Sequence, residues 1–541
     1  MSDRAVERVR RAYARIAETD RPEVWIDLRP ADDVRAEAAA LDDALPLAGT
    51  VFAVKGNIDV AGLPTTAGCP SYAYLPDRDA TAVARLRAAG ALVLGTTNLD
   101  QFATGLVGTR SPYGAVRNAV DPAYAAGGSS SGSAVAVALG IADFALGTDT
   151  AGSGRVPAAF NGIVGLKPTY GLVSADGVVP ACRSLDCVTV FGRSLTEARR
   201  ALAFLGAPSG SLAARRPGPW RVAAPSPSSL GDMDDGWAEQ FAAASRALAA
   251  AGAELLPVDP APFLEAAALL YDGAFVAERY AAVGAFVEKG SPDLDPVVAS
   301  IIGAAGAVPA HLLFADRERL AELRDRALAA FGDADALLLP TTPGHPTLAD
   351  VAADPVGANA RLGRFTNSTN LLGLCGAALP FGTVDGLPFG VMLLGPAHAD
   401  DRIAAVADLL VPEPVVRVAV AGAHLSGQPL NHELTQRRAR LVATTTTASA
   451  YRLYALDTTP PKPGLVRVPS GGAAIEVELW DVPAAGFATF ITGIPRPLAL
   501  GELELADGTS VTGFLCAPEA LPDAVDITRH GGWRSYLAAR R

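Results

Sequence analysis

Strand-like and helical segments alternate along the first 411 residues of this 541-residue chain. Residues 50–60 (TVFAVKGNIDV) and 91–99 (ALVLGTTNL) predict strands, and residues 79–90 (DATAVARLRAAG) predict a helix between them. A helix followed by a strand is predicted again at residues 236–258. Such alternation is typical of the α/β class. We therefore expect a central mixed β-sheet flanked by helices.

The pattern changes at the segment VPEP, where Pro412 and Pro414 end the preceding helical run and predict a linker. Residues 439–456 and 473–483 beyond it are strand-like and rich in β-branched side chains. The remaining length is sufficient for an independent domain. We therefore divide the chain into a domain of residues 1–411 and a smaller α+β domain of residues 412–541.

The composition excludes several functional classes. A formal charge of −12 argues against a nucleic-acid partner, because phosphate binding needs a basic face. No uncharged apolar stretch reaches the length of about 18 residues that a membrane span needs, and the N-terminus lacks the apolar core of a signal peptide. The five cysteines lack CxxC spacing and the six histidines lack HExxH spacing. We therefore expect a cytoplasmic protein without a metal or cofactor.

Two segments rich in glycine and serine interrupt the helical and strand patterns: residues 126–140 (AGGSSSGSAVAVALG) and 147–162 (GTDTAGSGRVPAAFNG). A flexible loop capped by serine accounts for the first segment taken alone. No GK[ST] follows it, which excludes a Walker loop, and its match to G-x-S-x-G lacks the strand that a nucleophile elbow needs. The second segment places Ser153 on nearly bare backbone, among residues with small side chains. Neither a flexible linker nor a strand explains this composition.

Lys55 lies inside the apolar run VFAVKGNIDV, where a solvated lysine would be poorly placed. Burial favours the neutral amine and lowers the pKa, as a general base requires. Moving that pKa from about 10.4 to about 7 costs roughly 4 kcal/mol, which a fold accepts more readily for chemistry than for packing. The alternative is a lysine at a strand edge whose ammonium group reaches water.

Lys55, the segment GGSSSGS and the segment GTDTAGSGRVPAAFNGIVGLKPTYGLVS together resemble the amidase signature family. The resemblance implies that Ser153 is the nucleophile, Ser129 the bridging serine and Lys55 the base. It also implies a cis peptide bond between Gly128 and Ser129. The separation of 24 residues between the two serines agrees with the family.

The bare backbone before Ser153 suits an anion site. A serine that attacks an amide carbonyl leaves an oxyanion, which needs N–H donors aimed at it. Side chains larger than a methyl group would obstruct those donors. We expect the N–H groups of Thr150, Ala151 and Gly152, with that of Ser153 as a further candidate, to form the oxyanion hole. Arg155 is expected to brace the loop.

The substrate must be selected by residues outside the signature, since the family hydrolyses many amides. Tyr271 and Arg279 stand eight residues apart on a predicted helix that Gly273 can bend. An arginine in a small amidase pocket indicates a substrate carboxylate held by a bidentate pair. The alternative is a surface arginine paired with Glu278 or with a nearby acid.

This stretch, residues 340–376 and residues 418–442 resemble the allophanate hydrolase family, and the likeness covers essentially the whole chain. The resemblance implies hydrolysis of allophanate (urea-1-carboxylate) to ammonia and N-carboxycarbamate, then CO₂, in urea degradation. Tyr271 and Arg279 match the family's substrate-binding pair, with Arg279 on the carboxylate. The partners expected are a small-molecule substrate and a second copy in a homodimer, with functional coupling to a separate urea carboxylase.

The C-terminal domain resembles the γ-glutamyl cyclotransferase-like fold, which is implicated in decarboxylation in related hydrolases. AGAHLSG places His424 on a glycine-rich loop after a predicted strand, where exposed N–H groups and an imidazole suit an anion. His432 is expected on a helix face. The alternative is a domain that only mediates assembly.

Two other functions stay open. One is a glutaminase or transamidation subunit, or another small-amide amidase with a non-catalytic C-terminal assembly domain. The net negative charge of the chain and its additional C-terminal domain argue against the transamidation role. The other is a catalytically idle scaffold, which the complete set of Lys55, Ser129 and Ser153 makes improbable.

Overall fold

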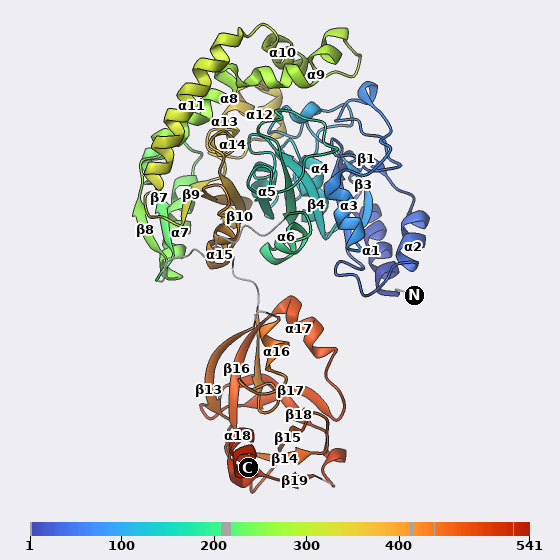
Figure 1. Cartoon of the computed structure of the whole chain (residues 1–541), viewed down its shortest axis with the longest axis vertical. Helices are drawn as coiled ribbons and strands as arrows, with labels where there is room; N and C mark the ends of the chain where they lie inside the picture. Colours follow the sequence, from blue (N-terminus) through green and yellow to red (C-terminus); the bar gives the residue numbers. More distant parts are fainter. Residues whose placement is uncertain (1–2, 207–217, 412–414, 438, 523, 541) are drawn as a thin grey trace. The chain divides into compact units, whose positions relative to one another are not determined.

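The computed structural model describes residues 3–206, 218–411, 415–437, 439–522 and 524–540 (Figure 1). The chain divides into two compact units, Met1–Pro412 and Glu413–Arg541. Pro412 and Pro414, which predicted a linker, lie outside the described residues.

An 11-stranded mixed sheet forms the centre of the first unit, in the order β1-β3-β2-β4-β6-β5-β10-β11-β9-β7-β8. β2 runs parallel to β3 and β4, whereas β6 runs antiparallel to β4. This sheet confirms the predicted mixed architecture. Its strands are β1 Trp25–Leu28, β2 Val51–Lys55, β3 Leu92–Thr97, β4 Phe144–Asp149, β5 Val164–Lys167, β6 Cys187–Gly192, β7 Arg221–Ala224, β8 Glu254–Pro257, β9 Ala336–Pro340, β10 Cys375–Val384 and β11 Leu387–Gly395.

Helices flank the sheet, and the segments predicted as helices at residues 79–90 and 236–258 contain α3 and α7. The helices of the first unit are α1 Asp3–Thr19, α2 Ala31–Ala39, α3 Thr81–Ala88, α4 Ser131–Ala138, α5 Val156–Phe160, α6 Leu195–Leu202, α7 Trp237–Ala250, α8 Ala261–Asp272, α9 Ala277–Lys289, α10 Pro296–Ala305, α11 Ala310–Phe331, α12 Leu348–Ala353, α13 Gly357–Leu362, α14 Asn367–Leu371 and α15 Asp400–Leu410. Among the described helices none alone has the length and hydropathy to cross a membrane, although α10 and α11, bent by 94°, meet that test together by length and composition.

Alternate residues of β2 face two separate apolar cores. Phe52 and Val54 pack in one core, and Val51 and Ala53 pack in the other, because successive side chains of a strand point to opposite faces. Helices α3, α6, α7 and α15 contribute to the first core, and α1, α2 and α4 contribute to the second. Both faces of the sheet are therefore covered, so Lys55 at the end of β2 is held in the interior.

The second unit has an apolar core of its own and two small sheets, ordered β13-β16-β12-β18-β17 and β15-β14-β19. This confirms the smaller C-terminal domain that contains both strands and helices. Its elements are β12 Val415–Val420, α16 Asn431–Thr435, β13 Arg440–Thr446, β14 Tyr451–Leu456, β15 Lys462–Arg467, β16 Glu476–Pro483, α17 Ala484–Ile491, β17 Leu498–Glu504, β18 Ser510–Cys516, β19 Val525–Asp526 and α18 Trp533–Ala539.

Candidate active site

Lys55 is the last residue of β2, and its side chain is completely buried. Its Nζ atom donates hydrogen bonds to Ser129 Oγ at 2.8 Å and to Thr148 Oγ1 at 2.7 Å. Burial lowers the pKa of Lys55 to about 7, against the opposing charges of nearby carboxylates. The alternative of a lysine that reaches water at a strand edge is therefore wrong, and a neutral amine is accessible near neutral pH.

Ser129 connects Lys55 to Ser153. Ser129 Oγ donates to Ser153 Oγ at 2.9 Å, so the three side chains form one continuous hydrogen-bonded path. The Gly128–Ser129 peptide bond is cis, as the resemblance implied. A hydroxyl group both donates and accepts, so with a neutral lysine the same contacts can carry a proton from Ser153 through Ser129 to Nζ.

The position before Ser129 admits only glycine. A Cβ atom on Gly128 would lie 2.0 Å from Asp100 Oδ2 and 2.7 Å from the backbone nitrogen of Gly108. The Asp100 carboxylate is itself buried and accepts the N–H groups of Val107, Gly108 and Arg110. Asp100 thus fixes the backbone against which the Gly128–Ser129 peptide packs.

A buried ion pair braces the loop that carries Ser153. Asp149, at the end of β4, and Arg155, directly before α5, are both buried and meet at 2.9 Å. Although burial alone raises the pKa of Asp149, the Arg155 guanidinium outweighs it and holds that pKa below its ordinary value. Arg155 also donates to Thr369 Oγ1 and Asn370 Oδ1 of α14. The prediction that Arg155 braces the loop is confirmed.

The predicted oxyanion hole needs one correction. The N–H of Gly152 donates to Asp149 Oδ1 at 2.9 Å, so this group orients the loop and is not free for an oxyanion. Gly152 is small for a different reason, because a Cβ atom there would lie 2.4 Å from Thr366 Oγ1. Within the described residues, no protein acceptor takes the N–H of Ala151 or Ser153. These two groups, with Thr150 beside them, stay the candidate donors.

Tyr271 and Arg279 are brought together by a break in the helix. α8 ends at Asp272, a short 3-10 turn covers Ala274–Val276, and α9 begins at Ala277. Arg279 Nη2 donates to Tyr271 Oη at 3.0 Å, and Nη1 donates to Thr104 Oγ1 at 2.9 Å. The two residues therefore lie on separate helices and meet in space.

Arg279 is a buried cation that makes no direct ion pair with a carboxylate of the described residues. The residue is 2% exposed, and the buried carboxylate of Asp186 acts on its charge only at longer range. Glu278 instead accepts hydrogen bonds from Ser184, so the predicted alternative of an Arg279–Glu278 surface pair is wrong. The charge of Arg279 acts on Lys55 and lowers its pKa further. A substrate carboxylate is the ligand that such a site lacks.

An apolar wall joins this pair to the loop of Ser153. Ala151, Cys182, Leu270 and Phe275 belong to one packed cluster, with Tyr271 half-buried against it. The candidate oxyanion donors and the Tyr271–Arg279 pair therefore border the same region. The arrangement can place a small acid-bearing amide with its carbonyl near Ser153.

In the second unit, His424 follows β12, with Nε2 3.1 Å from Glu433 Oε2. Its ring stacks on Phe514 at 5.3 Å and meets Phe490 edge to face. Burial lowers the pKa of His424, against the opposing effect of Glu433. A cavity of about 30 Å³ is lined by His424 and Lys462 among others. His432 lies on α16, which confirms its prediction.

The loop around His424 differs from the expectation in one respect. The N–H groups of Leu425 and Leu430 donate to backbone carbonyl groups of the same loop. The N–H of Ser426 donates to the buried carboxylate of Glu478 at 2.8 Å. These N–H groups are therefore not open to an anion, because two of them bond within the loop and the third bonds to β16. Lys462 lines the same cavity as His424, and its positive charge contributes to the lowered pKa of His424.

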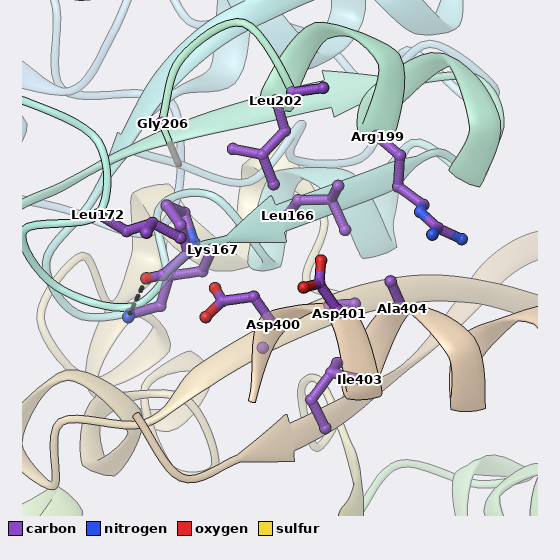
Figure 2. A pocket seen from close by; sticks show the side chains of 14 residues that line it. Leu166, Lys167, Leu172, Arg199, Leu202, Gly206, Asp400, Asp401, Ile403 and Ala404 are labelled. Atoms are coloured by element: carbon purple, nitrogen blue, oxygen red, sulfur yellow. Dashed lines mark hydrogen bonds between the residues drawn. The ribbon is translucent and has the colours of Figure 1, made fainter. Parts of the chain in front are cut away.

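Another pocket, of about 230 Å³, lies between β5, α6 and the start of α15 (Figure 2). Leu166, Leu202 and Ile403 line it, and Figure 2 shows the Lys167 ammonium group turned to the Pro168 carbonyl oxygen, 3.0 Å away. It contains none of the predicted site residues.

Three residues of the site were missing from the predicted set: Asp100, Thr148 and Asp149. A signal existed for each, because all three are polar: Thr148 and Asp149 end the buried strand β4, and Asp100 follows the buried strand β3 by three residues. Side chains at such positions converge on one edge of a sheet. Among the described residues, no group of three or more His, Cys, Asp or Glu side chains could hold a metal ion.

Residues 7–404 match the family model Amidase, and residues 416–538 match the model Allophanate hydrolase C-terminal domain. The chain is 41% identical to urea amidolyase of Saccharomyces cerevisiae over 92% of its own length and 30% of that protein. It thus spans less than a third of the length of the yeast urea amidolyases. It is 37% identical to a glutamyl-tRNA(Gln) amidotransferase chain of Symbiobacterium thermophilum, over 74% of this chain and 92% of that one.

Among solved structures, the chain is similar to Kluyveromyces lactis allophanate hydrolase. The TM-score is 0.69 at 38% sequence identity, and the match covers 99% of this chain and 97% of the other. The likeness therefore includes both units of the chain.

The titration of Lys55 predicts the pH dependence of amide hydrolysis. Only the neutral amine accepts a proton, so kcat/KM should rise about ten-fold per pH unit below the pKa and level off above it. With a pKa of about 7 for Lys55, the bend is expected near pH 7. Steady-state kinetics across this range measure it. The Lys55→Arg variant should be inactive throughout, and a wild-type profile that is flat well below pH 7 would contradict the assignment of Lys55 as the base.

Proposed function

The chain belongs to the amidase family and its C-terminal unit matches the allophanate hydrolase C-terminal domain; from this premise we propose that it hydrolyses allophanate, the carboxylate of urea. The terminal amide is released as ammonia, and N-carboxycarbamate remains. The observation that carries this proposal is Arg279, a buried guanidinium that makes no direct ion pair with a carboxylate of the described residues and lies close enough to Lys55 to lower its pKa.

In the proposed reaction, neutral Lys55 takes the proton of Ser153 through Ser129, along contacts of 2.8 Å and 2.9 Å. Ser153 Oγ attacks the amide carbonyl, and the oxyanion binds the N–H groups of Ala151 and Ser153. Collapse breaks the C–N bond, and Lys55 returns the proton through Ser129 to the leaving nitrogen as ammonia departs. Water then attacks the acyl group by the same path and frees Ser153.

Arg279 and Tyr271 supply the proposed selectivity. The Arg279 guanidinium donates to the substrate carboxylate, and Tyr271 and Thr104 hold the guanidinium in place at 3.0 Å and 2.9 Å. An amide without a carboxylate would leave the buried Arg279 without a direct ion pair and with only the longer-range charge of Asp186, which is less favourable. A glutaminase feeding tRNA amidation is less well supported, because the amidotransferase relative covers only 74% of this chain.

For the second unit, residues 412–541, we propose decarboxylation of N-carboxycarbamate at His424. The imidazole can deliver a proton, and Lys462 supplies a positive charge beside the cavity that both residues line. The homodimer, the coupling to a urea carboxylase and the cytoplasmic location belong to the same proposal. The name urea amidolyase, borne by the longer yeast relatives, supports the coupling.

The Arg279→Lys variant tests the substrate. It keeps the positive charge but loses the planar fork, so kcat/KM for allophanate should fall about ten-fold or more, equivalent to about 1.4 kcal/mol. Ammonia release is measured from allophanate, malonamate, biuret and glutamine. The wild-type enzyme should prefer allophanate, and the control Glu278→Gln, changed on the neighbouring residue of α9, should match it.

Two results would reject the proposed substrate. One is a wild-type enzyme that releases ammonia faster from glutamine than from allophanate. The other is an Arg279→Lys variant that hydrolyses allophanate as the wild-type enzyme does, because the carboxylate would then be bound elsewhere.

The His424→Ala variant tests the role of the second unit. Ammonia release should be retained while CO₂ release slows, because the hydrolytic residues are untouched and the imidazole is lost. NMR of ¹³C-labelled allophanate follows both products over time. His432→Ala, on the exposed surface of α16, is the matched control and should leave both rates unchanged. If CO₂ still appears in step with ammonia in His424→Ala, then His424 does not catalyse the second step.

A further inference from the structure

A pocket of about 540 Å³ lies where α1, the segment before β2 and α6 meet, remote from Ser153. Six arginines line it and two carboxylates, Asp143 and Glu197, face them. The chain as a whole carries a formal charge of −12, so this concentration of cations is local. The arginines are Arg4, Arg8, Arg11, Arg15, Arg193 and Arg200.

Four of these arginines form one stripe on α1. Arg4, Arg8, Arg11 and Arg15 recur at intervals of three and four residues, which keeps them within an arc of about 60° on a helix of 3.6 residues per turn. The buried residues of α1 lie on the adjoining face and pack against the sheet. The guanidinium groups therefore line the recess beside that contact.

The stripe brings like charges together, and carboxylates of the chain balance only part of that charge. Like charges three or four residues apart destabilise a helix, and positive charge near a helix N-terminus opposes the macrodipole. Asp143 pairs with Arg8 at 2.8 Å and Glu197 pairs with Arg193 at 3.2 Å. Arg15 pairs with Glu18, outside the pocket, at 2.9 Å. Arg4 and Arg11 form no ion pair within the described part of the chain, although the charge of Arg11 acts on the Glu7 carboxylate at longer range. The pocket thus holds more guanidinium groups than its own acids compensate.

We propose that this pocket binds a small polyanion, a molecule that carries two or more phosphate or carboxylate groups. Guanidinium groups bind both kinds of anion in bidentate pairs, and the cavity has the size of a small-molecule site. Arg8 is only 13% exposed in its side chain. Arg15 is also partly buried, whereas Arg4, Arg11, Arg193 and Arg200 are exposed. The size of the cavity therefore favours a small ligand over an acidic protein segment.

The pocket is distinct from the active site and the proposal does not rest on the proposed function. Thr50 precedes β2 and Asp143 precedes β4, and both residues line the pocket. The opposite ends of these strands carry Lys55 and Asp149. At about 3.3 Å per residue, the two regions are separated by roughly 15–20 Å. A polyanion would therefore contact the amino ends of the strands that support the hydrolytic residues.

Isothermal titration calorimetry of the full chain with inorganic pyrophosphate and, separately, with citrate tests the proposal at an ionic strength of about 0.15 M. We expect saturable binding of at least one of the two, and the comparison tells phosphate from carboxylate recognition. The double variant Arg4→Gln/Arg11→Gln should weaken it about ten-fold or more, because two charge-assisted contacts are lost. The control Arg10→Gln removes an arginine from the same helix outside the pocket, where it pairs with Glu7, and should bind as the wild-type chain does.

Two outcomes would overturn the proposal. Either the control weakens binding as much as the double variant, or both small anions fail to bind, which includes the case in which a glutamate-rich peptide binds instead. That case would assign the pocket to an acidic protein partner. Amide hydrolysis by each variant, measured without added anion, separates these outcomes from a failure of the proposed function.

Discussion

The buried ion pair between Asp149 and Arg155 is the contact on which the geometry of the site depends. A carboxylate in the protein interior is stable only when paired and hydrogen-bonded, and Asp149 meets this need with Arg155 and with the N–H groups of Gly152 and Gly154. The loop is thereby wrapped around the carboxylate. Ser153 is left at its tip, with the N–H groups of Ala151 and Ser153 free of protein acceptors among the described residues.

The second constraint is the burial of Lys55 in a covered sheet. Lowering its pKa from 10.5 to about 7 opposes folding by roughly 5 kcal/mol, and the apolar cores on both faces of β2 offset that cost. The positive charge of buried Arg279 lowers the pKa in the same direction. One guanidinium thus lowers the pKa of Lys55 and, in the proposed function, assists this base and receives the substrate carboxylate.

Much of this arrangement could be predicted from the sequence, because it is encoded in local patterns. The alternation of segments predicted the mixed sheet, and the apolar surroundings of Lys55 predicted its burial. Residue types do not reveal the direction in which a backbone N–H group points. The sequence therefore predicts the Gly152 N–H in the oxyanion hole, whereas in the structure this N–H donates to Asp149. The arginine pocket could not be predicted from the sequence either, because α1, Thr50 and Arg200 meet only in the folded chain.

The central claim is that Ser153, and not Ser129, attacks the carbonyl while Lys55 draws off its proton. Labelling with a fluorophosphonate followed by peptide mass spectrometry tests this most directly, because the reagent phosphonylates an activated serine and releases fluoride. The account predicts one adduct, on Ser153, that is absent from Ser153→Ala and forms faster as pH rises through about 7. An adduct on Ser129, or undiminished labelling of the Ser153→Ala chain, would contradict it.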